Sequence, residues 1–171
     1  MKGIVEVFQE VVDRVSERYG VGIKYIFGSA DYLKEQLDIF AQSYNTANSS
    51  FPLIALFTPI EEQREGTETT RASLNMIIAV NSEREWDNGE RLERTFRPVL
   101  RKIYDELLRT LKDDPRFNFG YSEEIKHSYS ENYSYGRYGA WTPSQQELGC
   151  AIDAIDIKNL KVTITQNCRT K

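Results

Sequence analysis

The sequence is poor in the residues on which most nucleophile and metal chemistry depends. Among 171 residues it has two cysteines and one histidine. Two thiols are too few for a disulfide framework or a thiolate metal site, so Cys150 and Cys168 are expected to stay reduced. The single histidine, His127, leaves Ser-His-Asp and Cys-His systems with only one candidate base. These shortages argue against Ser-His-Asp and Cys-His nucleophile systems, unless His127 serves as the base, and against a thiolate metal site.

The sequence also lacks an excess of positive charge and any long apolar run. Its formal net charge is -4, from 22 basic and 26 acidic residues. The chain therefore lacks the positive field that binds phosphate backbones, which argues against nucleic acid as the main ligand. No apolar run approaches the roughly 20 residues of a membrane helix, and Met1-Lys2-Gly3 leads into an amphipathic pattern rather than a signal peptide. We expect no membrane contact and assembly in the cytosol.

What is present is the composition of a folded protein. Hydrophobic residues make up 40% and charged residues 28% of the chain, far from the depleted composition of disordered proteins. The length suits one hydrophobic core. We therefore predict a single domain over residues 1–171.

The first third of the chain predicts a helix, a strand and a second helix. Apolar residues at helical spacing predict an N-terminal helix that ends near Tyr19, before Gly20. Alternation over residues 23–27 predicts a short strand. Gly28-Ser29 can then turn the chain and cap a second helix. The apolar residues of this helix are Leu33, Leu37 and Phe40.

Two further strands are predicted in the middle of the chain. Phe51–Phe57 is apolar throughout, as in a strand covered on both faces. Arg71–Val80 alternates strictly, as in a half-buried strand. Between them, Thr58–Thr70 has four glutamates and no hydrophobic period, which predicts a solvated, mobile loop. The two strands should pair antiparallel, as a hairpin with a long tip.

The clearest helix is predicted over about Arg97–Lys112, with Pro98 in its first turn and its end before Pro115. It should seal one face of the sheet. A final strand covers 155–164, where the apolar parity switches at Lys158-Asn159 and predicts a bulge. The fold class is thus α/β (α+β), with a mixed, mainly antiparallel sheet of about four strands against the N-terminal and the long helix.

One local motif has an enzymatic interpretation. A strand that runs into Gly28-Ser29 and then a helix resembles the opening of the nucleotidyltransferase signature. That family needs an Asp-x-Asp or Asp-x-Glu pair on a following strand to grip two metal ions. Here Asp38 is followed by Ile39 and Phe40 and lies in a helical pattern. We therefore favour a plain Gly-Ser helix start.

The remaining titratable groups also favour ordinary roles. Glu124 and His127 have the spacing of a carboxylate-bridged metal site, but the chain has no second Glu-x-x-His, which favours a surface histidine. The carboxylates of Asp153 and Asp156 are expected to be solvated, as are those of Glu61 and Glu62. We accordingly expect no catalytic residue, no cofactor and no metal ligand.

Residues 117–149 form an irregular, aromatic-rich segment. Tyrosine and tryptophan are enriched in protein interfaces, and they also cover cores as irregular flaps, so both interpretations of the tract from Tyr129 to Trp141 stand equally. A stacking platform for nucleic acid is disfavoured because acidic residues outnumber basic ones there. The candidate protein-interface residues are Tyr133, Tyr135, Tyr138 and Trp141 in this segment, with Glu61, Glu62 and Arg64 in the charged loop at 58–70.

Taken in order, these elements resemble the bacteriophage tail terminator, or tail-completion, proteins. The resemblance covers most of the chain. It is carried by Phe51-Pro52-Leu53-Ile54-Ala55-Leu56-Phe57, by the alternation from Arg71 to Val80, by Arg97-Pro98-Val99-Leu100-Arg101-Lys102-Ile103-Tyr104 and by the closing Ile155 to Ile164. The segment from Phe117 to Gly149 and the helix near Leu33 have no match in that pattern.

The resemblance implies a structural subunit without an active site. Such a subunit forms a ring, commonly a hexamer, that caps the tail tube and joins it to the neck. The implied partners are further copies of the chain, the tail tube protein and a neck or head-completion protein, in a virion assembled in the host cytoplasm. DNA would pass through the ring without specific binding. The alternatives are another neck or baseplate protein, or a degenerate nucleotidyltransferase-like domain.

Overall fold

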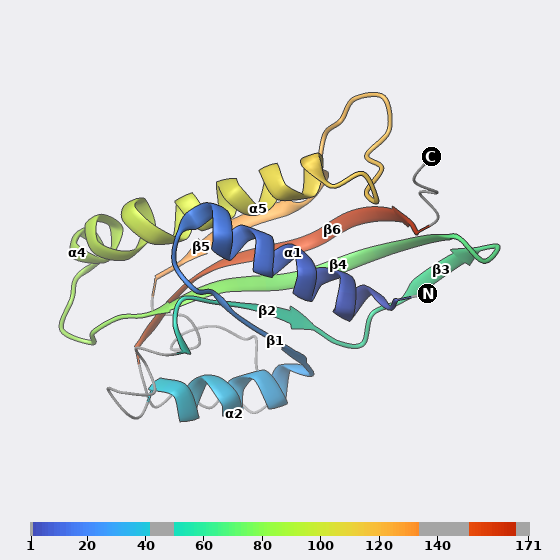
Figure 1. Cartoon of the computed structure of the whole chain (residues 1–171). Helices are drawn as coiled ribbons and strands as arrows, with labels where there is room; N and C mark the ends of the chain where they lie inside the picture. The colour runs from blue at the N-terminus through green and yellow to red at the C-terminus, as the bar shows by residue number, and fades with distance from the viewer. Residues whose placement is uncertain (1, 42–49, 134–150, 167–171) are drawn as a thin grey trace.

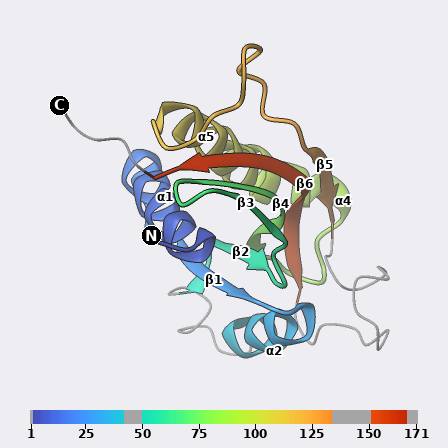
Figure 2. The ribbon, with the colours of Figure 1, turned by 90° about the vertical axis from the view of Figure 1, so that its right-hand side faces the viewer.

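The structure, a computed structural model, describes residues 2–41, 50–133 and 151–166 (Figure 1). Within these ranges a six-stranded mixed sheet lies between two layers of helix. Figure 2, which looks along the sheet, shows α1 and α5 on one side and α2 on the other. The predicted α+β class and mainly antiparallel sheet are confirmed, with six strands in place of about four.

The sheet has the strand order β1-β2-β4-β6-β5, with β3 beside one end of β4. β1 and β2 are parallel, and every other pair is antiparallel. The strands are β1 (Lys24–Gly28), β2 (Leu53–Phe57), β3 (Glu62–Glu65), β4 (Thr69–Asn81), β5 (Ser128–Asn132) and β6 (Ile152–Thr165). β2 is buried almost throughout, which confirms the prediction from its continuous apolar sequence.

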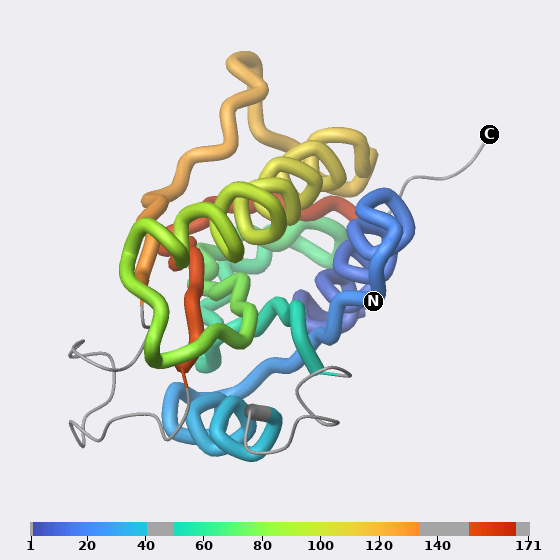
Figure 3. The backbone as a smooth tube through the Cα atoms, turned by 90° about the vertical axis from the view of Figure 1, so that its left-hand side faces the viewer, coloured from blue at the N-terminus to red at the C-terminus, as the bar shows by residue number. Residues whose placement is uncertain are grey.

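The larger core lies between the sheet and two long helical elements. α1 (Ile4–Tyr19) ends at Gly20, whose φ of 82° is the left-handed conformation that glycine adopts most easily. α4 (Asn88–Arg91), η1 (Leu92–Leu100) and α5 (Arg101–Asp113) follow one another without a break (Figure 3). Their apolar sides meet the even-numbered residues of β4, from Leu74 to Val80, and their partners on β6.

A second core lies on the opposite face of the sheet. α2 (Ala30–Ala41) packs Leu33, Leu37 and Phe40 against residues of β2, β4 and β6. These residues alternate with those of the larger core, because successive side chains of a strand point to opposite faces. Towards the β3–β4 hairpin this face carries polar residues such as Arg71, Ser73 and Lys161. α2 thus covers only part of the face.

The long helix begins earlier than predicted. It starts at Asn88, with the Asp87 carboxylate accepting from the Glu90 N–H at 2.8 Å, and it contains Pro98 in its interior. Around the proline the winding is π-helical, and the Arg101 N–H bonds to the Phe96 carbonyl five residues back. The wider turn accommodates a residue that has no N–H and whose ring would clash in a tighter turn. The prediction of Pro98 in the first turn was therefore wrong.

The predicted mobile loop at 58–70 contains regular structure. Residues 62–65 form β3, which pairs with the first residues of β4, and Gly66 turns the hairpin with a φ of 66°. The sequence has no hydrophobic period here because the hairpin extends past the core and both its faces meet solvent. Charged side chains on such an exposed strand also protect it against aggregation.

The irregular segment at 117–149 likewise contains a strand, β5, which forms the sheet edge beside β6. Within β6 the predicted bulge is confirmed. The β4–β6 register shifts between Leu74 and Met76, and Asn159 has a φ of 55°. Its N–H bonds to the Asn75 Oδ1 at 3.0 Å. The bulge keeps the apolar residues on both sides of it facing the larger core.

A substitution at the bulge tests this geometry. Asn159→Val is expected to lower the free energy of unfolding by about 1–2 kcal/mol, because a β-branched residue is strained at positive φ. Asn159→Gly, the matched control, should be nearly neutral because glycine adopts this conformation freely. Urea unfolding followed by circular dichroism measures both. Equal stability of the two variants would contradict a left-handed residue at this position.

Candidate interaction surfaces

The β3–β4 hairpin brings three of the candidate interface residues together. Glu61 immediately precedes β3, while Glu62 and Arg64 lie within it. The Arg64 Nη2 is 2.9 Å from the Glu62 Oε2, and the Arg64 side chain is 60% exposed. The hairpin extends past both long helices at the end of the molecule near the N-terminus (Figure 1). Its charged groups are therefore placed for contact with another molecule.

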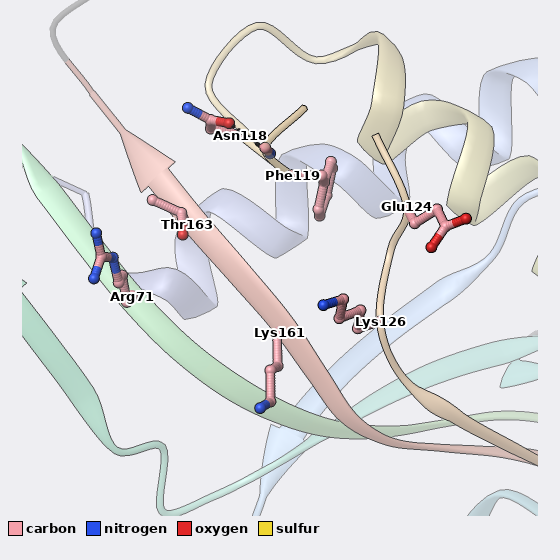
Figure 4. A pocket seen from close by; sticks show the side chains of 8 residues that line it. Arg71, Asn118, Phe119, Glu124, Lys126, Lys161 and Thr163 are labelled. Carbon is pink, nitrogen blue, oxygen red and sulfur yellow. Dashed lines mark hydrogen bonds between the residues drawn. The ribbon is translucent and has the colours of Figure 1, made fainter. Parts of the chain in front are cut away.

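Two shallow pockets lie beside the hairpin on the polar part of the sheet face. One, of about 560 Å³, runs between the start of β3 and the strands β4 and β6. The other, of about 360 Å³, lies between the segment before β5 and the same two strands (Figure 4). Arg71, Lys161 and Thr163 line both. They thus form the common wall of one continuous polar surface.

The second pocket has more cationic than anionic groups. Arg71, Lys126 and Lys161 reach it from β4, the segment before β5 and β6, against one carboxylate, that of Glu124. Arg71 forms an ion pair of 2.9 Å with Glu65. Across the described residues, the Lys126 and Lys161 ammonium groups form no ion pair. The pocket therefore suits an acidic group of a partner. Sequence reasoning missed this pocket. The polar residues Lys161 and Thr163, which alternate with apolar residues in the last strand, could have indicated a polar sheet face there.

The aromatic residues at the sheet edge surround a carboxylate. Glu131 accepts hydrogen bonds from the hydroxyls of Tyr129 at 2.6 Å and Tyr133 at 3.0 Å. Arg101 donates to both of its oxygens, at 2.6 and 3.0 Å. The Tyr133 ring lies 4.2 Å from that of Phe96, so this half-buried residue covers the core. The candidates Tyr135, Tyr138 and Trp141 lie outside the described residues.

This cluster shifts the protonation of its members. Hydrogen bonds from Arg101 are the largest influence on Glu131, and they lower the pKa of its carboxyl to about 2 although partial burial opposes them. Burial raises the pKa of Tyr129, and the adjacent Glu131 charge raises it further. The cluster thus holds a charged carboxylate and neutral tyrosines at physiological pH. It ties the edge strand β5 to the long helix.

Replacing Glu131 with glutamine is expected to lower stability at pH 7. We expect a loss on the order of 1–2 kcal/mol, since the Arg101 side chain is 42% exposed and solvent screens the pair. The native pKa lies below the ordinary value, so the stabilisation is complete above about pH 4.5 and is lost as the pH falls towards 2. Thermal melts of both proteins between pH 7 and 2.5 should therefore converge. The exposed control Glu85→Gln should match the wild type throughout.

Asp153 and Asp156 do not have the solvated positions predicted for them. Asp153 is fully buried, and its Oδ1 lies 2.7 Å from the Nη1 of Arg91, itself only 1% exposed. Thr95 donates to the other carboxylate oxygen at 2.8 Å. Asp156 is 9% exposed, and burial raises the pKa of its carboxyl. Sequence reasoning missed the Arg91–Asp153 pair because 62 residues separate its partners.

Arg91 also holds a loop in place. Its guanidinium donates to the Ser82 hydroxyl at 2.6 Å and to the carbonyls of Glu83 at 2.6 Å and Trp86 at 3.2 Å. These bonds connect the end of β4, the turn after it and the start of the long helix. Together with the ion pair to Asp153, these hydrogen bonds compensate the Arg91 guanidinium for the water that it loses on burial. The network is a structural one.

His127 is not the surface residue that was predicted. It is half-buried, with Nδ1 2.7 Å from the Ile125 carbonyl and Nε2 2.7 Å from the Tyr104 hydroxyl. A carbonyl oxygen only accepts, so Nδ1 carries a proton and donates, and in the neutral ring Nε2 accepts from the tyrosine. Both ring nitrogens are thus used in packing the segment before β5 against α5.

The Gly28-Ser29 motif acts as a helix start. The Ser29 Oγ accepts from the Tyr32 N–H at 3.3 Å at the beginning of α2. The Tyr32 ring lies over Gly28 so closely that an added Cβ would come within 2.4 Å of it. Asp38 lies within α2, as predicted, and not on a strand. These positions differ from those that a nucleotidyltransferase site requires.

Over residues 2–41, 50–133 and 151–166, no three His, Cys, Asp or Glu side chains are grouped so that they could hold a metal ion. None of the helices in these ranges has the length and apolar composition to cross a membrane. The sequence matches no model of a known protein family, and no curated protein is significantly similar to it.

Proposed function

We propose that the protein is a structural subunit of a phage tail, which forms a ring that terminates the tail tube and joins it to the neck. The observation that carries the proposal is the element order that underlies the resemblance. A helix, two strands that pair in parallel, a protruding hairpin, a long helix and a bulged last strand occur in this order along the chain, with the unmatched α2 and β5 between them. By the resemblance, such a ring is commonly a hexamer.

The surfaces next to the hairpin support axial contacts in such a ring. The hairpin carries Glu61, Glu62 and Arg64, and the adjoining pocket carries the cations Lys126 and Lys161. One end of the subunit thus offers groups of both signs to the tail tube protein or to a neck protein. The net charge of -4 suits a channel through which DNA moves without being held.

Sedimentation and native mass spectrometry of the purified chain test the ring. We expect a closed oligomer at high protein concentration, with a mass that is a fixed multiple of 19.8 kDa. Electron micrographs of this species should show annular particles. A strict monomer at every concentration, which also fails to bind tail tube subunits, would contradict the proposal.

Exchanging Glu61, Glu62 and Arg64 together for alanine tests the hairpin. Because Glu61 and Arg64 are exposed and Glu62 is half-buried with the exposed Arg64 as its ion-pair partner, we expect the melting temperature to change little and the ring mass to stay unchanged. Binding to assembled tail tubes, measured by co-sedimentation, should fall at least tenfold. An exposed set on α2, Asp31 and Glu35 changed to alanine, serves as the matched control. Equal binding by both variants would remove the hairpin from the tube contact.

A further inference from the structure

Among the described residues, β1 and β5 stand at the two ends of the strand order, with the short β3 beside one end of β4, and β1 and β5 match each other in two ways. Each is five residues long. Each also carries an exposed aromatic side chain, Phe27 at 49% on β1 and Tyr129 at 40% on β5. Edge strands present backbone hydrogen-bonding groups that pair readily with another strand.

Two hydrogen bonds between β1 and the chain around β2 show which backbone N–H and C=O groups of β1 point out of the sheet. The Lys24 N–H donates to the Pro52 carbonyl at 3.1 Å, and the Gly28 carbonyl accepts from the Thr58 N–H at 2.8 Å. In a parallel pair alternate residues point their N–H and C=O groups to the same neighbour. The backbone groups of Tyr25 and Phe27 therefore point away from β2, out of the sheet.

The outward groups of β5 follow in the same way. The Ser82 N–H donates to the Ala151 carbonyl at 2.9 Å, and this pair continues the β4–β6 register by one residue beyond Asn81 and Ile152. Because alternate residues of an antiparallel strand bond to the same neighbour, the odd-numbered residues at this end of β6 direct their backbone groups to β4. The even-numbered residues between them, Ala154 and Asp156, direct their backbone N–H and C=O groups towards β5, where Asn132 and Ser130 are their partners. Tyr129 and Glu131 therefore direct their backbone groups away from β6.

The strand directions allow these edges to meet. β1 is parallel to β2, and the steps from β2 to β4, β6 and β5 are each antiparallel, so β1 and β5 run in opposite directions. A rotation about an axis along the strands leaves strand directions unchanged. A neighbouring copy in such a ring therefore brings its β5 antiparallel to β1, which is a favourable arrangement for direct pairing.

One register of that pairing satisfies all the outward groups. With Phe27 opposite Tyr129 and Tyr25 opposite Glu131, every outward N–H on one strand faces an outward carbonyl on the other. All four side chains then lie on the helix-covered face, because Tyr25 bonds to the Val5 carbonyl of α1 and Tyr129 lies 4.8 Å from Tyr104 of α5. The two exposed aromatic residues become a cross-strand pair.

The helices next to these edges carry complementary charges. α1, which is bonded to β1, has the exposed acids Glu6, Asp13 and Glu17. The long helix beside β5 has Arg97 and Arg101, with side chains 57% and 42% exposed. When β1 of one copy meets β5 of another, the acidic helix of the first approaches these arginines of the second. Each arginine already pairs with a carboxylate of its own copy, Arg97 with Glu93 and Arg101 with Glu131, so the helix charges add only a weak attraction to the backbone pairing.

We propose that β1 of one copy pairs antiparallel with β5 of the next, Phe27 opposite Tyr129, as the repeating contact of the ring. The contact is heterologous, since two different edges meet, and such contacts generate rings or open fibres. The inference rests on the proposed function in taking a second copy of the chain as the partner.

Disulfide trapping tests the pairing in a chain whose own cysteines are changed by Cys150→Ser and Cys168→Ser. Phe27→Cys and Tyr129→Cys are made separately, mixed and oxidised. The mixture is expected to form a covalent dimer within minutes, while each variant alone forms no covalent dimer. Phe27→Cys mixed with Tyr121→Cys is the matched control, because Tyr121 is fully exposed and lies off the proposed contact. Circular dichroism confirms that each variant is folded.

The chain that carries both Phe27→Cys and Tyr129→Cys should form a covalent ladder that stops at the number of copies in the ring. A covalent dimer of Phe27→Cys alone would instead show a symmetric β1–β1 contact and overturn the inference. A third outcome would overturn the inference but leave the ring function standing. In this outcome the wild type is oligomeric, the cysteine variants form no cross-link, and the Phe27→Asp variant remains oligomeric. A wild-type monomer that binds no tail tube and yields no cross-link would contradict both.

Discussion

Replacing Asp153 with asparagine is expected to lower the free energy of unfolding by about 3 kcal/mol. The change removes the negative charge 2.7 Å from Arg91 and leaves a guanidinium that is 1% exposed without a counter-ion. Removing one partner of a buried pair leaves the other charge desolvated and uncompensated, and this costs more than the pair itself contributes. The loop after β4 should loosen as well, because Arg91 also holds the Glu83 and Trp86 carbonyls.

Asp156→Asn is the matched control, since it makes the same chemical change three residues further along β6. Burial raises the pKa of the Asp156 carboxyl, so the folded state binds a proton more tightly than the unfolded state. The stability that this residue contributes is therefore largest at acid pH and falls as the pH rises through the native pKa. At pH 7 the asparagine variant should be as stable as the wild type or more stable. Urea unfolding at pH 7 compares both variants, and equal losses would contradict the assigned network.

Phe8→Ala is expected to cost about 3–5 kcal/mol, the usual loss when a buried phenylalanine is truncated. Phe8 is fully buried, and its ring meets that of Phe117 edge to face at a centroid distance of 5.8 Å. The contact joins α1 to the segment that follows α5. The surrounding helix and sheet cannot collapse fully into the space that the ring leaves.

Phe119→Ala is the matched control for this prediction. Phe119 stacks on the other side of Phe117, with ring centroids 6.2 Å apart, but it is only half-buried. Its loss should cost about 1 kcal/mol, because much of its surface already meets solvent. Chemical unfolding of both variants gives the comparison, and a loss below 1.5 kcal/mol for Phe8→Ala would contradict its position in the core.

The elements with a strong hydrophobic period were predictable. Arg71–Val80 is the greater part of β4, and the parity switch at Lys158-Asn159 is the bulge of β6. The prediction that β4 is half-buried was wrong for Met76–Val80, which is buried on both faces because α2 covers the second face. Elements without a period were missed. β3 and β5 are held by backbone pairing to β4 and β6, and their side chains mostly meet solvent, so no apolar pattern marks them.

The interaction surfaces were predictable only in part. Glu61, Glu62 and Arg64 were identified from charge alone and do lie together on one hairpin. The proposed pairing of the sheet edges could not be foreseen, because it depends on which strands end up outermost. Phe27 and Tyr129 are 102 positions apart in the sequence, and nothing local distinguishes them from aromatic residues of the core.

Local patterns in the sequence determined the helices and strands that line the larger core and the bulge of β6, because side-chain periodicity reports directly on burial. Only the tertiary structure decided which charged residues are buried and which partners they have. Asp153 was expected at the surface and lies buried because the fold places Arg91 beside it. The reason is physical: hydrophobic burial follows from neighbours a few positions away, whereas a buried charge requires a partner that only folding brings near.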